Sequence, residues 1–131
     1  MLRNMLKSKI HGARVTAASV DYEGSITVDR GLLETAGILP YEEVHVLDLE
    51  SGARLTTYAL PGQAGEVCIN GAAARLVKAG DQVIILTYAS LTPAELEDYE
   101  PVVIRLDENN RPVAKTRAGA AVGRPESGLP Q

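Results

Sequence analysis

The chain has no phenylalanine and no tryptophan, and aromatic residues make up only 4% of it. Valine, leucine and isoleucine must therefore fill the interior, and the β-branched members of this group favour strands. A length of 131 residues gives room for one domain with one hydrophobic core. These absences predict a single, mainly β domain.

The chain also has little cysteine and no excess of positive charge. Cys68 is the only cysteine, so the chain can form neither an internal disulfide nor a multi-thiol metal site, and a reducing compartment is the simplest interpretation. The net charge of -4 gives no electrostatic footprint for nucleic acid or for an anionic membrane surface. We therefore expect neither of these partners and no metal.

Long apolar runs are missing as well. The N-terminal residues lack the apolar stretch of a signal peptide, and no segment approaches the roughly 18 apolar residues of a membrane span. We therefore expect a soluble, cytoplasmic protein.

Several short apolar segments between turn residues predict strands. They cover residues 5–10, 14–20, 25–28, 44–49, 55–60, 66–69, 82–89 and 102–106. The run Val83-Ile84-Ile85-Leu86 is apolar on both faces, which is typical of a strand with neighbours on both sides. We expect residues 1–108 to form the single folded domain.

Two short helices have signals at both ends. Asp29 and Asn70 are candidate N-caps for residues 30–36 and 71–79, and a glycine follows each segment as a terminator. A third helix is expected from Thr92-Pro93, since proline suits the first helical position.

The composition changes near the C-terminus. From Asn109 onward the chain is rich in Arg, Pro, Gly, Ala and Ser and has almost no large apolar residues. Such a segment cannot bury enough surface to offset its ordering entropy. Residues 109–131 are therefore predicted to form a disordered tail, above all from Pro112 onward.

The segment Tyr22-Glu23-Gly24-Ser25 has two interpretations. It is either a simple turn before a strand or an autocatalytic cleavage site. In the second case Ser25 Oγ attacks the Gly24 carbonyl and leaves an ester, and elimination followed by hydrolysis leaves a pyruvoyl group on the new N-terminus. Glycine suits the first position because it tolerates the sparsely populated backbone angles that such an attack needs.

Five segments decide between these interpretations. They are Met5-Leu6-Lys7-Ser8-Lys9-Ile10-His11, Tyr22-Glu23-Gly24-Ser25, Ala36-Gly37-Ile38-Leu39, Arg54-Leu55-Thr56-Thr57-Tyr58-Ala59 and Asn70-Gly71-Ala72-Ala73-Ala74. Together and in this order they resemble the landmarks of the pyruvoyl-dependent aspartate 1-decarboxylases. The resemblance covers residues 3 to about 90.

This resemblance implies a function and an architecture. It implies a precursor that cuts itself into residues 1–24 and 25–131 and then converts L-aspartate to β-alanine for pantothenate and coenzyme A synthesis. It also implies a double-psi β-barrel and a homotetramer with active sites between subunits. The strand pattern by itself is equally compatible with a sandwich.

The reaction explains the cofactor. Loss of carbon dioxide from an α-amino acid leaves a carbanion, which needs an electron sink conjugated to the substrate nitrogen. The pyruvoyl group made from Ser25 supplies that sink by forming a Schiff base with the amine. Pyridoxal phosphate would do the same, but no lysine lies in a convincing phosphate-binding context, so we expect none.

Several residues outside the cleavage motif are candidates for substrate contacts. Arg54 has the fork geometry that binds a carboxylate, and we assign it to the side-chain carboxylate, because a strong ion pair with the leaving carboxylate would stabilise the ground state. Lys9 is a second candidate for this role, and a surface lysine is its alternative interpretation. Gly71, Ala72 and Ala73 are expected to bind substrate through backbone amides at the start of a helix.

Two adjacent residues are expected to serve different steps. Thr57 matches the residue that polarises the Gly24 carbonyl during cleavage and later contacts substrate, and Tyr58 matches the proton donor to the carbanion. In a regular strand these two side chains point to opposite faces. A bulge, a strand end or a site shared between subunits would reconcile the two roles.

Four further residues have weaker signals. Asn70, Tyr22 and His11 are supporting candidates, and each is also explained as a cap, packing or surface residue. His45 lies in an alternating strand without an identifiable partner. Two histidines and one cysteine make a poor metal set.

Two alternative functions remain at this level. A small barrel can be a non-enzymatic binding module, because fold alone does not decide function. A hydrolase that retains Ser25 as nucleophile would need a histidine partner, and the chain lacks a G-x-S-x-G elbow. Only the decarboxylase interpretation requires two chains and an N-terminal ketone.

Overall fold

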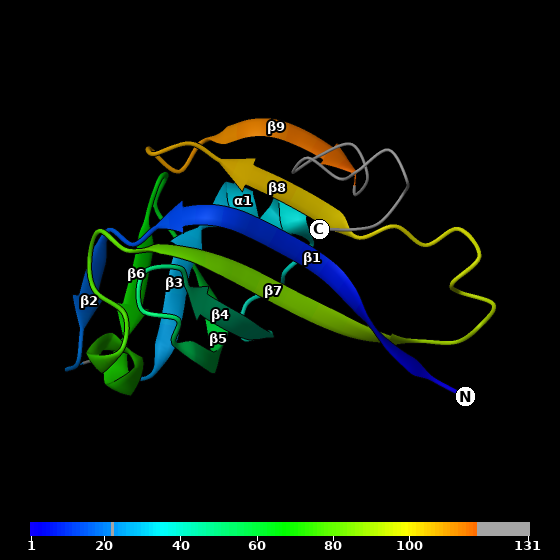
Figure 1. Ribbon diagram of the computed structural model, residues 1–131, viewed down its shortest axis with the longest axis horizontal. Coiled ribbons are helices and arrows are strands. Elements are labelled where there is room, and N and C mark those ends of the chain that lie inside the picture. Colours follow the sequence, from blue (N-terminus) through cyan, green and yellow to red (C-terminus); the bar gives the residue numbers. More distant parts are fainter. Residues whose placement is uncertain (22, 118–131) are drawn as a thin grey trace.

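The computed structural model describes residues 1–21 and 23–117, and Tyr22 lies outside this part. Within it the chain forms nine strands, one α-helix and one 3₁₀ helix (Figure 1). The elements are β1 (Arg3–Arg14), β2 (Ala17–Ser19), β3 (Ser25–Asp29), α1 (Arg30–Ala36), β4 (Glu43–Asp48), β5 (Arg54–Gly62), β6 (Val67–Asn70), η1 (Gly71–Arg75), β7 (Gln82–Leu91), β8 (Val102–Leu106) and β9 (Pro112–Arg117).

The strands form one mixed sheet in the order β2-β6-β3-β5-β4-β7-β1-β8-β9. The pairs β1 with β8, β2 with β6 and β3 with β5 are parallel, and the other neighbours are antiparallel. The prediction of a mainly β fold is thus confirmed. The strand order does not by itself identify the double-psi barrel, so the barrel type stays a prediction.

Valine and isoleucine fill the core, as the lack of large aromatic residues requires. The largest fully buried side chains are Ile10, Ile26, Ile69, Ile85, Ile104, Val15, Val28, Val44, Val46, Val67, Val77 and Val83. Strand β7 lies between β4 and β1, which confirms the position predicted from its apolar run. No helix in residues 1–21 and 23–117 is long and apolar enough to cross a membrane.

Helix α1 forms as its end signals predict. The Asp29 carboxylate accepts hydrogen bonds from Gly31 N at 2.7 Å and Leu32 N at 3.3 Å, and Gly37 ends the helix in the left-handed conformation. The helix buries one face against the sheet. It links β3 to β4 and so helps fix the strand that begins at Ser25.

The other two helix predictions are wrong. Residues 71–75 form only the short 3₁₀ helix η1, and the Asn70 side chain makes no capping hydrogen bond to it. The segment from Thr92 forms turns, although Thr92 N donates to the Glu95 carboxylate as in a helix start. A capping signal alone does not extend a helix without an apolar face to pack.

The predicted tail is also wrong in part. Residues 112–117 form strand β9, which pairs with β8. Asn110, at a φ of 61°, is 3% exposed, and its amide binds the backbone of Arg14 and the Gly65 carbonyl at 2.7 to 3.0 Å. The turn before β9 is therefore part of the folded domain, while the prediction for residues 118–131 falls outside the described residues.

Candidate active site

Ser25 is the first residue of β3, directly after the exposed Gly24. Its side chain is buried, with 3% of its surface exposed. Strand β3 is held on both sides, by antiparallel pairing with β6 and parallel pairing with β5. The candidate nucleophile thus lies at the first residue of a strand that is paired on both sides.

The backbone at Gly24 differs from the expectation. Gly24 does not have a positive φ, and a Cβ atom at this position would meet nothing within 4 Å. In the uncleaved chain the glycine is therefore not required by strain or by crowding. The advantage of glycine for an attack on the Gly24 carbonyl is therefore a hypothesis about the backbone conformation during cleavage.

Asn70 is the direct partner of Ser25. Its Nδ2 group donates to Ser25 Oγ at 3.0 Å and to Thr27 Oγ1 at 3.2 Å. The two strands place these side chains together, because Ser25 pairs with Asn70 and Thr27 with Cys68. A residue expected as a helix cap is instead the main polar neighbour of the predicted nucleophile.

Ser25 opens into a cavity of about 490 Å³. The residues that line it are Glu23, Ser25, Thr27, Tyr58, Leu60, Glu66, Cys68 and Asn70. Tyr58 reaches this cavity from β5, the strand that runs parallel to β3. The structure therefore brings together Ser25, Asn70 and Tyr58, which the sequence analysis selected separately.

Thr57 lies on the other face of β5. It pairs with the buried Val44, whereas Tyr58 pairs with the exposed Glu43, and β4 and β5 pair without a register shift. Since paired residues of antiparallel strands share a face, the two side chains point in opposite directions. Of the three explanations offered for their separate roles, a bulge between these strands is excluded.

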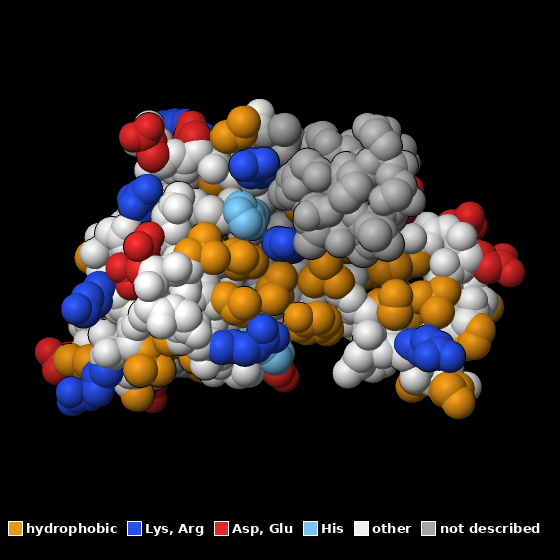
Figure 2. All heavy atoms as spheres, viewed as in Figure 1, with side chains coloured by type: hydrophobic (Ala, Val, Ile, Leu, Met, Phe, Trp, Pro, Cys, Tyr) orange, Lys and Arg blue, Asp and Glu red, His pale blue; other side chains and the backbone are white. Residues whose placement is uncertain are grey.

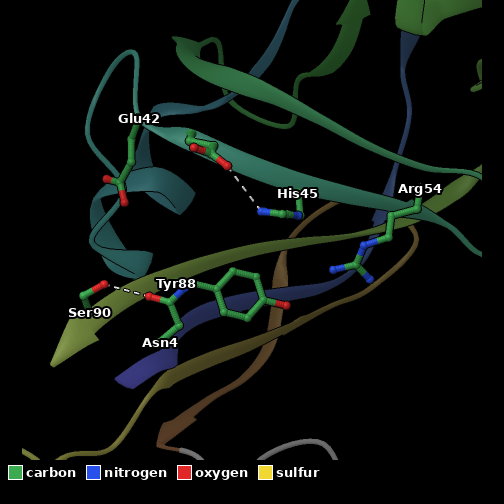
Figure 3. A pocket seen from close by; sticks show the side chains of 7 residues that line it. Asn4, Glu42, His45, Arg54, Tyr88 and Ser90 are labelled. Atoms are coloured by element: carbon green, nitrogen blue, oxygen red, sulfur yellow. Dashed lines mark hydrogen bonds and ion pairs between the residues drawn. The ribbon is translucent and has the colours of Figure 1, made fainter. Parts of the chain in front are cut away.

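Arg54 lines a different cavity, of about 520 Å³. Its other lining residues are Asn4, Glu42, Glu43, His45, Tyr88 and Ser90. Figure 3 shows the Arg54 and His45 side chains extending into this space near the Tyr88 ring. Arg54 and Ser25 therefore do not share a cavity in one chain.

His45 has the partners that could not be identified from sequence. Its Nε2 atom lies 3.4 Å from a carboxylate oxygen of Glu43, and its ring meets the Tyr88 ring edge-on at 5.2 Å (Figure 3). Glu42 is paired with Lys7 of β1, whose Nζ also donates to the Gly37 carbonyl. These contacts join β4 to β7, and β1 to the residue before β4.

Other predicted site residues lie outside both cavities. Lys9, Gly71, Ala72 and Ala73 are all described, and none of them lines either space. His11 is half-buried on β1, and burial, followed by the charges of Lys9 and Arg105, lowers its pKa. Its imidazole is therefore mainly neutral at neutral pH.

Sequence reasoning missed Thr27, Glu66 and Cys68 as neighbours of the candidate nucleophile. A signal for two of them is present, because alternate residues of a strand share a face. Thr27 follows Ser25 by two positions and Cys68 precedes Asn70 by two. The two patterns meet only because β3 pairs with β6. Local sequence patterns do not specify such a long-range pairing.

Comparison with known proteins identifies first the class and then the family. The class is that of small β-sheet decarboxylases, since the family model for aspartate decarboxylase matches residues 1–113. Aspartate 1-decarboxylase of Salinibacter ruber is 54% identical over 116 residues, which cover 87% of this chain and 79% of the relative. Those of Thermoanaerobacter pseudethanolicus and Desulfitobacterium hafniense are 54% and 56% identical over 115 residues, or 86% of this chain and 98% and 91% of the relatives. The chain belongs to the aspartate decarboxylase family.

Proposed function

We propose that this chain is an aspartate 1-decarboxylase that converts L-aspartate to β-alanine and carbon dioxide. Family membership supports the activity. One structural observation carries the assignment of the site: Ser25 lies buried at the start of β3, with its Oγ held by Asn70 and its cavity shared with Tyr58. On the family resemblance, the product serves pantothenate synthesis in the cytoplasm.

The proposed maturation begins at the Gly24-Ser25 peptide. Ser25 Oγ forms a bond to the Gly24 carbonyl carbon, the bond to the Ser25 nitrogen breaks, and that nitrogen takes up the hydroxyl proton. Loss of the Ser25 Cα proton then breaks the bond between Cβ and the ester oxygen and releases residues 1–24 as a carboxylate. Water replaces the nitrogen of the resulting dehydroalanine, ammonia leaves, and a pyruvoyl group begins the chain of residues 25–131.

The surroundings of Ser25 fit a pyruvoyl group. The ketone oxygen of such a group needs a hydrogen-bond donor in this buried position, and Asn70 Nδ2 already donates to the Ser25 side chain. When present, the group supplies the electron sink that decarboxylation of an amino acid requires. The cavity beside it leaves room for a substrate of the size of aspartate.

Each remaining residue has a separate role in the proposal. Thr57 polarises the Gly24 carbonyl, and Tyr58 delivers a proton after carbon dioxide has left. Arg54 binds the side-chain carboxylate of aspartate, supported by Lys9. The backbone amides of Gly71, Ala72 and Ala73 contact the substrate.

The proposal includes a homotetramer of double-psi β-barrels with active sites between subunits. The separate cavities of Ser25 and Arg54 support a shared site, because the described residues of one chain place these two groups in different cavities. Figure 2 shows hydrophobic side chains gathered on the face formed by β1 and β7, and Tyr88 of β7 is 40% exposed. Such a surface is typical of a subunit contact.

Formation of β-alanine tests the proposed function. Purified, matured protein is incubated with L-aspartate, and β-alanine and carbon dioxide are measured together with the fraction of cleaved chain. We expect equal amounts of both products from the parent and none from Ser25→Ala. A fully cleaved protein that forms no β-alanine would contradict the assignment.

A further inference from the structure

Cys68 lies one hydrogen bond away from the partner of Ser25. On β6 its Sγ atom is 3.3 Å from Asn70 Oδ1, and the Ile69 carbonyl is a more distant alternative at 4.0 Å. Cys68 also lines the Ser25 cavity. A chain of contacts therefore runs from the thiol through the Asn70 amide to the Ser25 hydroxyl.

The two ends of an amide have opposite hydrogen-bonding character. The oxygen of Asn70 accepts only, and its nitrogen donates only, so the orientation of the amide decides what Ser25 encounters. With Oδ1 bound by the thiol, Nδ2 donates to both Ser25 and Thr27. With the amide reversed, Oδ1 would instead accept the Ser25 hydroxyl proton.

Orientation matters for the nucleophile. A hydroxyl oxygen gains negative charge as it attacks and loses its proton, and an N–H donor aimed at that oxygen stabilises this charge. An amide oxygen at the same point would bind the ground-state hydroxyl and repel the developing charge. The observed orientation is the productive one.

The surroundings keep the thiol in its protonated form. Burial, and then the negative charge of Glu66, raise the pKa of Cys68. The S–H proton needed for a bond to Asn70 Oδ1 is thus retained at neutral pH. A thiolate at Cys68 would favour the opposite orientation of the Asn70 amide, because its negative charge would attract Nδ2 away from Ser25.

We propose that Cys68 is a positioning residue for self-cleavage, whose S–H group fixes the Asn70 amide with Nδ2 towards Ser25 Oγ. The inference rests on the proposed cleavage between Gly24 and Ser25. It assigns to Cys68 no contact with the reacting atoms and no nucleophilic role. On this proposal the rate of self-cleavage depends on the S–H proton of Cys68, and the stability of the fold does not.

Matched substitutions test this role in the full-length chain. Cys68→Ala and Cys68→Val remove the donor, whereas Cys68→Ser retains one. Freshly isolated precursors are incubated at one pH and temperature, and denaturing mass spectrometry follows the appearance of residues 25–131. We expect the Ala and Val variants to cleave about threefold to tenfold more slowly, as for loss of one neutral hydrogen bond, and the Ser variant to cleave near the parental rate.

Thermal melting in a Ser25→Ala background separates positioning from folding. We expect the Tm of Cys68→Ala and of Cys68→Val to lie close to that of Ser25→Ala alone. If one of the two variants unfolds at the assay temperature, the cleavage rate of the other is used. Parental cleavage rates in the Ala and Val variants, or slow cleavage in Cys68→Ser, would overturn the role of Cys68 alone. A parent that never cleaves would overturn this role and the proposed maturation together.

Discussion

Thr57 and Tyr58 are neighbours in sequence, but their side chains lie on opposite faces of β5. Tyr58 lines the Ser25 cavity, and Thr57 shares its face with the buried Val44. In the described part of one uncleaved chain Tyr58 therefore lines the Ser25 cavity and Thr57 does not. Thr57 also lies inside β5 and not at its end, so its proposed role in cleavage depends on a site shared between subunits. This arrangement separates their proposed roles into two independent experiments.

Replacement of Thr57 tests its role in cleavage. If Thr57 stabilises charge on the Gly24 carbonyl oxygen, Thr57→Val, which keeps the shape of the side chain, should cleave about a hundredfold more slowly. Thr57→Ser retains the hydroxyl and serves as the control. The rate is measured by mass spectrometry of the precursor, and parental cleavage of Thr57→Val would remove Thr57 from the maturation step.

Replacement of Tyr58 tests its role in turnover. Tyr58→Phe keeps the ring that stacks on Tyr41 at 6.0 Å but removes the hydroxyl. It should mature like the parent and form β-alanine roughly 10² to 10⁴ times more slowly per pyruvoyl group, because the carbanion lacks its proton donor. Turnover is divided by pyruvoyl content so that a maturation defect is not counted. Equal turnover would exclude Tyr58 as the required donor.

Replacement of Arg54 tests substrate binding. Arg54 lies outside the Ser25 cavity, so Arg54→Ala should cleave normally. Its kcat/KM for L-aspartate should fall by about 10² to 10³, since an unpaired substrate carboxylate is costly to bury. Arg54→Lys keeps the charge without the bidentate fork and should recover only part of this loss. A cleaved Arg54→Ala enzyme with parental kcat/KM would show that another group binds the carboxylate.

Strand β4 ends at a buried acid, Asp48. Asp48 is 2% exposed, and its Oδ1 accepts from the amides of Glu50 and Ser51 at 2.7 and 3.2 Å. Burial, and then the neighbouring Asp81 carboxylate, raise the pKa of Asp48 above its ordinary value of 3.8. The pKa of Asp81 is lowered, first by its contact with Asp48.

A raised carboxyl pKa means that the folded chain holds this proton more tightly than the unfolded chain. This tighter proton binding stabilises the folded chain. The stabilisation is fully present below the pKa that Asp48 has in the unfolded chain, and it is lost as the pH rises through the pKa that Asp48 has in the folded chain. Asp48→Asn mimics the protonated acid and avoids this loss. In a Ser25→Ala background, the Tm difference between Asp48→Asn and its parent should shift in favour of Asn from pH 4 to pH 8. Plots of Tm against pH that run parallel for Asp48→Asn and its parent would contradict a shifted pKa of Asp48. Asp48→Ala should be less stable than the parent at every pH.

Local patterns predict the parts of the fold that depend on local interactions. Alternating apolar residues placed most strands, and Asp29 and Gly37 placed both ends of α1. Strand β9 was missed because its composition offers little apolar surface. It is an edge strand that begins with Pro112, a position where a missing N–H is tolerated.

The site depends more strongly on contacts between distant residues. Asn70 has the chemistry of a helix cap, and only the pairing of β3 with β6 turns it into the partner of Ser25. The separation of Arg54 from Ser25 likewise follows from the packing of strands and not from spacing along the chain. The family landmarks single out candidate residues without stating which of them meet in one chain.

The central claim is that Ser25 becomes the cofactor, and denaturing mass spectrometry of the matured parent tests it most directly. The account predicts two chains, residues 1–24 and residues 25–131, the second of which has an N-terminal ketone and no free amine. Ser25→Ala should remain a single inactive chain. An intact single chain that converts L-aspartate to β-alanine at full activity would contradict the account.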